Sequence, residues 1–364
     1  MNSWKEPPDT GDHVPEPSET SERAKRFADI ASRTVVKMGD YEHIEAHKAR
    51  DLLPRSIWRD ILREGCLAIL GGESKAKKSW FALGLCMHAV CVRPFLGIRM
   101  EGKVRQRCAI VLDFELLKGN IMSRFVALAE AFADDPVEWR AIWDNVEIRA
   151  HRGMLAEDVP WIDYCAHVIR CSKQGDLVIV DCLQALPAGD ANDPAAVRRV
   201  LGLLQAAATQ SGACVVVVDH FNKSNEARGK NRLSGSVAKA ATPDAILLLE
   251  SDGRDFITFS TELRMDPSRD PLTLEFRSPS EGFRVVDQSE REERKDAAKD
   301  RKNAELLAKL FPDIGRSYTK QELALNIGKS EKTVENWLKG LAGAFTIHHG
   351  SGKNPHQYSR IVAG

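Results

Sequence analysis

The sequence predicts an α/β fold built on a mostly parallel sheet, followed by a small helical domain. Three observations lead to this fold class. Short, almost wholly apolar segments of strand length alternate with helical segments from residue 66 to residue 263, as in sheets that are buried on both faces. The first strand runs into a turn rich in Gly, Ser and Lys and then into a helical pattern. A mixed-charge run precedes a separate C-terminal region, residues 304–364.

Composition places the chain among ordinary globular proteins. Of its 364 residues, 43% are hydrophobic and 29% are charged, and the formal net charge is +0. No apolar run approaches the ~18 residues that a membrane span requires. The 8 cysteines show no paired C-x-x-C spacing, which is typical of reduced thiols. We therefore expect a cytoplasmic protein of about two domains with no membrane partner.

The N-terminal region differs from the rest of the chain. Residues 1–24 are acidic and Pro-rich and lack apolar periodicity, so we expect a disordered tail there. Residues 25–63 form a leader that ends in an apolar pattern. In this pattern Leu52, Ile57 and Ile61 could clasp a core or a neighbouring subunit.

The predicted strands lie within residues 64–287, which we take as the bounds of the α/β domain. They are CLAIL (66–70), CAIVLDF (108–114), NVEIRA (145–150), DLVIVD (176–181), ACVVVVD (213–219), DAILLLE (244–250) and FITFSTEL (256–263).

The turn after the first strand matches a phosphate-binding loop with one departure. A strand, a Gly-containing turn and a helix follow one another there, which is the setting of a P-loop. Lys78 would reach phosphate oxygens and Ser79 would hold Mg²⁺, while backbone N–H groups cradle the phosphates. Lys77 stands in place of the second glycine, where a left-handed backbone costs a side chain about 1–2 kcal/mol. Alone, the turn could equally be a basic surface turn. The predicted ATP-contacting residues are Gly72, Glu73, Ser74, Lys75, Ala76, Lys77, Lys78, Ser79 and Trp80.

Polar residues at three strand ends strengthen this interpretation. Glu115 follows the second strand, Asp181 ends the fourth and His220 follows the fifth. Open α/β sheets bind ligands at the carboxyl ends of their strands, and a carboxylate such as Asp181 suits a Mg²⁺ shell. A single such carboxylate more often caps a helix or pairs with a cation. Three polar strand ends after a P-loop-like turn favour a nucleotide site.

Positive charge gathers in residues 222–239, which hold five basic side chains and one acidic one. Four of these cations, Lys223, Arg228, Lys230 and Arg232, could track the phosphates of single-stranded DNA. A solvated surface loop is the alternative. The segment has no aromatic residue, which argues against base stacking.

Taken together, these segments resemble the RecA-fold hexameric helicases of the DnaB type and their RepA-like relatives of plasmids, phages and mobile elements. The resemblance covers roughly residues 50–280. It rests on LDFELLKGNIMSRF (112–125), VIVDCLQAL (178–186), VVVDHFNKS (216–224), RLSGSVAKAATPDAIL (232–247) and TELRMDPSRDPLTLEF (261–276).

The resemblance implies a RecA-like P-loop core that hydrolyses ATP with Mg²⁺ held at Ser79 and Asp181. Glu115 would activate the attacking water and His220 would sense the γ-phosphate. Arg264 would be a finger that enters the next subunit's site. In the family a lysine stands two residues before this arginine, whereas this chain has Glu262. The implied partners are single-stranded DNA in a central channel, further copies of the chain in a homo-hexamer, and a primase or initiator.

The C-terminal region follows a charged stretch, residues 288–303, which is typical of a solvated helix or a linker. We take it as the linker at the domain boundary. Residues 304–364 show helical patterns with Thr319 and Ser330 as N-caps and Gly328 as the turn between two helices. This region resembles a winged helix-turn-helix domain. Its recognition helix would present Lys332, Asn336 and Lys339 to duplex DNA, although many such modules instead bind proteins.

The sequence therefore favours an ATP-dependent, ring-forming DNA helicase or translocase that serves replication of a mobile element. One alternative is a DNA-binding initiator, regulator or scaffold whose ATPase core is degenerate, slow or inactive. Another is a recombinase-like filament. The helicase interpretation requires hydrolysis that single-stranded DNA stimulates, whereas a scaffold requires at most nucleotide binding.

Overall fold

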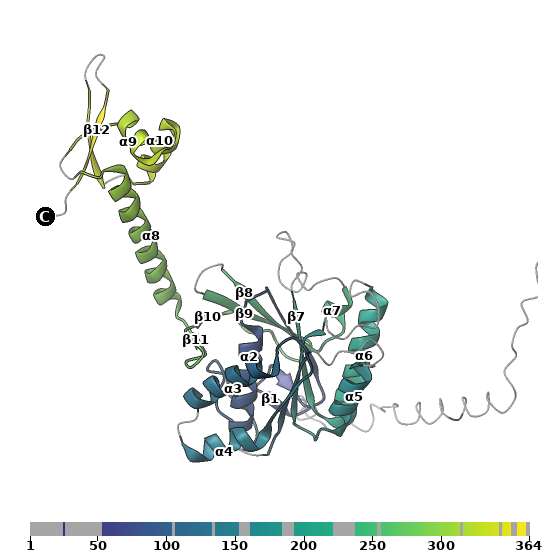
Figure 1. The fold of residues 1–364 in the computed structure, drawn as a ribbon. Helices are drawn as coiled ribbons and strands as arrows, with labels where there is room; N and C mark the ends of the chain where they lie inside the picture. The colour runs from purple at the N-terminus through teal and green to yellow at the C-terminus, as the bar shows by residue number, and fades with distance from the viewer. Residues whose placement is uncertain are drawn as a thin grey trace, which may run out of the picture. The chain divides into compact units, whose positions relative to one another are not determined.

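The computed structural model (Figure 1) describes most of the chain from residue 53 onward. The tail, most of the leader including Leu52, and the four predicted DNA-contacting cations from Lys223 to Arg232 lie outside the described residues. The described parts are residues 25, 53–103, 106–132, 135–152, 161–183, 193–220, 237–252, 256–313, 316–341, 344–350 and 355–361.

A mixed, mostly parallel sheet forms the centre of the fold, as predicted. Among the described residues it has nine strands in the order β11-β10-β9-β8-β3-β7-β6-β4-β5. Six strands are parallel: β3 (Leu67–Gly72), β4 (Ala109–Asp113), β5 (Val146–Ala150), β6 (Leu177–Asp181), β7 (Cys214–His220) and β8 (Ala245–Ser251). Three more extend it antiparallel: β9 (Phe256–Leu263), β10 (Leu272–Phe276) and β11 (Phe283–Val285).

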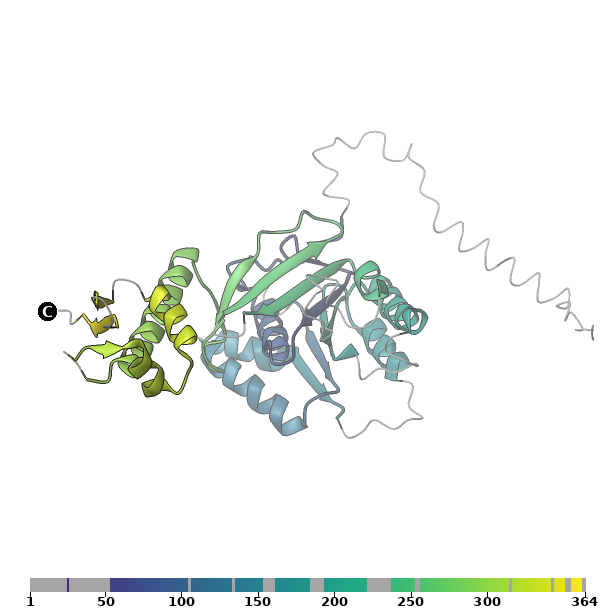
Figure 2. The same cartoon turned by 90° about the horizontal axis from the view of Figure 1, so that it is seen from above.

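Helices cover both faces of this sheet (Figures 1 and 2). On one face lie α2 (Lys78–Cys91), α3 (Lys118–Phe132) and α4 (Pro136–Asn145). On the other lie α5 (Trp161–Cys171) and α6 (Pro194–Ser211), and the short α7 (Val237–Ala241) contacts α6. Because both faces are covered, side chains that point either way from β3, β6 and β7 are buried. The near-continuous apolar runs in the sequence follow from this arrangement.

The end of the predicted leader belongs to the α/β domain. A hairpin of β1 (Ser56–Trp58) and β2 (Leu62–Arg63) packs its apolar side chains into the core beside α2. Trp58 is fully buried, and its ring stacks on that of Phe259 at 5.7 Å between centroids. Ile57 and Ile61 are buried in the same core, so they clasp this chain's own domain. The compact unit begins at Arg55, not at residue 64 as we expected.

The C-terminal module contains a small core of its own. It is built from the end of α8 (Gln288–Leu310), β12 (Tyr318–Thr319), α9 (Lys320–Ile327), α10 (Glu331–Gly340), β13 (Phe345–His348) and β14 (Gln357–Arg360). Thr319 caps α9 through a capping box with Glu322, and Ser330 caps α10, as predicted. Gly328 ends α9 with φ 62, a conformation that glycine adopts without strain.

The predicted linker is part of a helix. Residues 288–303 and the following residues to Leu310 form one continuous α8, so the boundary expected between 303 and 304 falls inside it. Opposite charges spaced i,i+4, such as Glu290 with Arg294 and Arg301 with Glu305, favour this helix. No helix among the described residues is long and apolar enough to cross a bilayer.

Candidate nucleotide-hydrolysis site

The turn between β3 and α2 is the candidate phosphate-binding loop, and we call it the phosphate turn. Gly72 ends β3, where an added Cβ would lie 2.8 Å from the carbonyl oxygen of Leu249 on β8. Lys77, which stands in place of the second glycine, has φ 64 and ψ 24. Lys75 is also left-handed, with φ 72. The turn therefore keeps the backbone geometry of a glycine at position 77 at some cost in strain.

Lys78 begins α2 and points its ammonium group back over the turn. The side chain is buried, and Nζ donates to the carbonyl oxygens of Gly72 and Glu73 at 2.9 Å each. Nζ also lies 3.1 Å from Nδ1 of His220. Burial lowers the pKa of Lys78, while the nearby carboxylates of Asp181 and Glu115 oppose that shift. A phosphate in the turn would replace carbonyl contacts with a full negative charge.

Glu115 and His220 face each other across the sheet edge. His220 ends β7 and pairs in register with Gly72 of β3, which brings it beside the turn. Its Nε2 lies 3.6 Å from Oε2 of Glu115. The hydrogen bond with His220 is the main cause that lowers the pKa of Glu115. The Glu115 carboxylate therefore stays ionised in the neutral range and lies where a water molecule could be oriented.

Asp181 lies deep in the same region, at the end of β6. Its side chain is 2% exposed, and this burial raises its pKa, whereas a hydrogen bond from Ser79 lowers it. Oδ1 accepts no hydrogen bond from any described residue. Mg²⁺ prefers hard oxygen donors. The Ser79 hydroxyl and the Asp181 carboxylate, whose Oδ1 accepts no hydrogen bond from a described residue, are donors of this kind. Ser79 and Asp181 therefore fit Mg²⁺.

Of these side chains, Lys78, Ser79, Glu115 and His220 line one cavity of about 260 Å³. Its wall continues from the turn to an aromatic group: Trp80 lies 5.4 Å from the ring of Phe276 on β10, and the Arg124 guanidinium lies 5.3 Å from the Trp80 ring. The cavity is lined by Ser74, Lys75, Lys77, Lys78, Ser79, Trp80, Glu115, Leu116, Arg124 and His220. The cavity therefore combines lysine side chains that could contact phosphates with the flat ring of Trp80.

Residues 35–226, more than half of the chain, match the family described as AAA domain. The chain belongs to that AAA-domain family. No curated protein matches the sequence.

Two solved structures are similar to this AAA-domain protein. One is entitled "The Structure Of A DnaB-Like Replicative Helicase And Its Interactions With Primase". The two chains superpose with a TM-score of 0.50 and are 14% identical in sequence, and the match covers 73% of this chain and 72% of that one. The other is the isolated ATPase domain of a second protein, with a TM-score of 0.48 and 13% identity, and the match covers 75% of this chain and 100% of that one. The match to the DnaB-like helicase structure confirms the predicted resemblance for the fold.

Two further residues of the site were given no role from the sequence. Asp113 is buried, which raises its pKa to about 7, and its Oδ1 accepts the backbone N–H groups of Glu115 and Leu116 at 3.1 and 2.6 Å. It thereby orients the turn that carries Glu115. Arg124 stands in the I-M-S-R stretch of the family resemblance, and this signal could have identified it.

A buried ion pair supports the strand that carries His220. Lys239 of α7 lies 2.8 Å from Asp219, and the two side chains are 2% and 0% exposed. Asp219 pairs in register with Gly71 of β3, so the ion pair lies beside the phosphate turn. Lys239 appeared in the sequence as one more cation of the 222–239 segment. Its burial instead shows that it neutralises a carboxylate inside the fold.

Arg264 does not reach the cavity of its own chain. It follows β9, where Nη1 lies 3.7 Å from Oδ1 of Asp244 and Nη2 donates to the carbonyl oxygen of Ala241. About half of the side chain is exposed. Glu262, two residues earlier, pairs in register with Ile246 of β8. Arg264 is therefore placed at a surface of the chain and apart from its phosphate site.

The C-terminal candidates share one helix face. Lys332, Asn336 and Lys339 follow the i, i+4, i+7 spacing on α10, and all three are exposed. Lys339 is paired with Glu335 at 3.3 Å.

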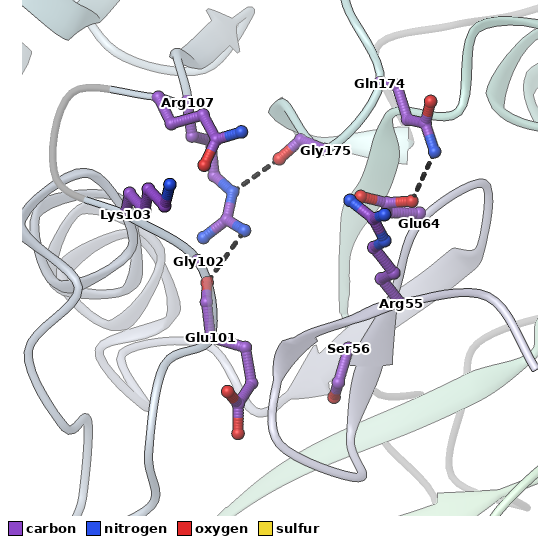
Figure 3. A pocket seen from close by; sticks show the side chains of 10 residues that line it. Arg55, Ser56, Glu64, Glu101, Gly102, Lys103, Arg107, Gln174 and Gly175 are labelled. Carbon is purple, nitrogen blue, oxygen red and sulfur yellow. Dashed lines mark hydrogen bonds between the residues drawn. The ribbon is translucent and has the colours of Figure 1, made fainter. Parts of the chain in front are cut away.

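A larger cavity, of about 380 Å³, lies at the opposite edge of the sheet (Figure 3). Arg107 lines it from the start of β4, and Gln174 and Gly175 from the start of β6. The Arg107 guanidinium donates to the carbonyl oxygens of Gly175, Ala89 and Glu101. These contacts join elements at the amino ends of the strands, away from the phosphate turn.

Replacing Lys77 with glycine is expected to stabilise the protein slightly and to leave ATP affinity equal or improved. Glycine relieves a left-handed strain of about 1–2 kcal/mol, against the loss of a cation–π contact with Phe276 worth about 0.5–1 kcal/mol. Thermal unfolding and titration with a fluorescent ATP analogue measure the two effects. Lys75→Gly is the matched control, because Lys75 is also left-handed. A collapse of affinity in Lys77→Gly alone would show that Lys77 itself holds phosphate.

Proposed function

We propose that this protein is an ATP-dependent DNA helicase or translocase of the replicative type. The observation that carries the proposal is that Lys78, Ser79, Glu115 and His220 line one cavity at the carboxyl edge of the sheet. Asp181 is hydrogen-bonded to Ser79 beside this cavity. Phosphoryl transfer to water needs a cation beside the phosphates, oxygen ligands for Mg²⁺ and an ionised carboxylate beside the attacking water.

Each residue has a role that its environment supports. Lys78 neutralises charge on the β- and γ-phosphates, and Glu115 orients the attacking water and accepts its proton. His220 lies between these two side chains, so it reports the presence of the γ-phosphate to β7. Mg²⁺ held by Ser79 and Asp181 would supply further neutralisation of the phosphate charge.

The position of Arg264 supports an assembly in which the chain acts as a ring, with a homo-hexamer as the expected form. The guanidinium is half exposed and lies away from its own cavity. A finger donated to a neighbouring subunit would make hydrolysis depend on assembly.

Two regions are proposed to contact DNA. Lys223, Arg228, Lys230 and Arg232 would hold single-stranded DNA in the central channel of the ring. The C-terminal module would act as a winged helix-turn-helix, whose α10 presents Lys332, Asn336 and Lys339 to duplex DNA. The exposed i, i+4, i+7 face of α10 supports this role. We further propose replication of a mobile element as the setting, with a primase or initiator as partner.

Substitutions in the two regions are expected to have different effects on DNA binding and on ATP hydrolysis. Alanine at Lys332, Asn336 and Lys339 together should weaken duplex binding and leave ATP hydrolysis stimulated by single-stranded DNA. Alanine at Arg228, Lys230 and Arg232 together should remove the stimulation and flatten the salt dependence of single-strand binding, because fewer counterions are released. Fluorescence anisotropy over a salt series and steady-state ATPase rates give the two readouts.

The strained Lys77 also fits a second function, that of a DNA-binding initiator or scaffold with a slow ATPase core. In that case hydrolysis does not respond to single-stranded DNA in any variant, and the triple substitution on α10 removes all DNA affinity. Stimulated hydrolysis in the unsubstituted protein would exclude this second function.

A further inference from the structure

A thiol, an imidazole and a carboxylate meet at the edge of the sheet that carries the phosphate turn. Glu115 follows β4, Cys182 follows β6 and His220 ends β7, and these three strands are neighbours in the sheet. One ligand atom of each residue lies within 4.8 Å of the other two. One pair, Oε2 of Glu115 and Nε2 of His220, is 3.6 Å apart.

This donor set differs from the one that suits Mg²⁺. Mg²⁺ takes oxygen ligands, whereas a sulfur, a nitrogen and an oxygen together favour Zn²⁺ and similar thiophilic cations. Bond lengths of about 2.0–2.3 Å at tetrahedral angles place ligand atoms about 3.3–3.6 Å apart. The Glu115–His220 separation already has this value, and an approach of the Cys182 sulfur from within 4.8 Å completes three ligands. Glu115 is partly exposed, which leaves a fourth position open to water.

The surrounding charges favour a bound cation only moderately. The carboxylate of Asp181 attracts a metal, and the ammonium of Lys78 repels one. Lys78 also lies 3.1 Å from Nδ1 of His220, so metal at Nε2 requires Lys78 to turn away from the ring. The carbonyl oxygens of Gly72 and Glu73, which Lys78 already contacts, can hold the ammonium group after this turn.

We propose that Glu115, Cys182 and His220 form a binding site for a thiophilic divalent cation, Zn²⁺ above all, in the nucleotide-free protein. Binding releases the proton of the Cys182 thiol to solvent. The proton of the neutral His220 ring lies on Nδ1, which Lys78 has left, so that Nε2 is free to bind the cation. The bound cation inhibits hydrolysis, since it occupies two side chains of the ATPase site. The inhibition rests on the proposed function, whereas the metal binding does not.

Cobalt binding to the full-length, nucleotide-free protein tests the site directly. After chelator treatment, Co²⁺ is titrated as the probe. A tetrahedral thiolate site gives visible d–d bands and a sulfur-to-cobalt charge-transfer band in the near ultraviolet. We expect both to saturate at one equivalent and to disappear when Zn²⁺ is added. Cys182→Ser should lose the charge-transfer band and bind Zn²⁺ about 10²-fold more weakly or worse.

Cys171→Ser is the matched control. Cys171 is exposed and lies 3.7 Å from His167, so it is the alternative thiol and imidazole pair for adventitious metal. The control should keep the full cobalt spectrum. Thermal unfolding shows whether Cys182→Ser is folded, and His220→Gln, which should also lose tetrahedral cobalt, gives an independent variant. A charge-transfer band that survives Cys182→Ser, or its absence from the unsubstituted protein, overturns the proposal.

Hydrolysis rates test the inhibitory consequence. For each protein the rate with micromolar Zn²⁺ is divided by its own rate without Zn²⁺. The unsubstituted protein should be inhibited about tenfold or more and should recover on chelation, whereas Cys182→Ser should resist. Equal inhibition of both proteins overturns the regulatory part. If the protein hydrolyses no ATP even without Zn²⁺, the proposed ATPase function fails, and the cobalt spectrum still decides the metal site.

Discussion

Glu115→Gln is expected to bind ATP and to hydrolyse it about 10²–10⁴ times more slowly than the unsubstituted protein. The amide has nearly the shape of the carboxylate and can keep its contact with His220, but it carries no charge and cannot accept the proton of the attacking water. Single-turnover hydrolysis measures the loss, and titration with a fluorescent ATP analogue shows that binding remains.

Two further variants make this result specific. Lys78→Ala should lose ATP binding itself, because it removes the cation that lies over the turn. Glu130→Gln, which changes an exposed glutamate on α3, should behave as the unsubstituted protein. Unchanged turnover in Glu115→Gln would mean that another group activates the water, and the assignment of Glu115 would be wrong.

Mixing Arg264→Ala subunits with Glu115→Gln subunits is expected to restore hydrolysis that neither variant shows alone. A finger donated in trans is worth about 10³–10⁵ in rate in other phosphoryl-transfer systems. In a mixed ring, an intact Arg264 of one subunit can enter the intact site of an Arg264→Ala neighbour. Steady-state rates across a series of mixing ratios, with the oligomeric state followed by light scattering, measure the recovery.

The control for the finger is Arg269→Ala. Arg269 lies close to Arg264 in the chain, but it contacts the carbonyl oxygen of Arg59 and the carboxylate of Asp60. The Arg269→Ala variant should therefore hydrolyse ATP by itself, without being mixed with a second variant. Mixed rings that form and yet show no recovery would assign the finger to a residue acting within its own subunit or to another arginine.

Much of the fold could be predicted because its signals are local. Apolar runs such as 213–219 can be accommodated only where a strand is covered on both faces, and the structure places β7 there. The caps at Thr319 and Ser330 were likewise readable, since a cap depends on residues within one turn. The strands β10 and β11 were not predicted as strands, because they are short and carry polar side chains among the apolar ones.

The candidate site was predicted in outline for a similar reason. Parallel strands all end at one edge, so polar residues after separate strands must gather there. The left-handed backbone at Lys77 also followed from its place in the loop pattern. The charged stretch was less decided, because a mixed-charge run is compatible with coil and with helix. Ion pairs of Arg284 and Arg294 with Glu275 and Glu290 support the helix here.

By itself, the sequence determined the alternation of strands and helices, the position of the phosphate turn and the identity of its polar strand ends. These properties depend on neighbouring residues and on the two-residue and 3.6-residue periods of the backbone. Only the tertiary structure decided the strand order, the burial of Lys239 against Asp219, and the meeting of Cys182 with Glu115 and His220. Such contacts join residues far apart in the chain, and packing of the whole sheet, not any local pattern, selects them.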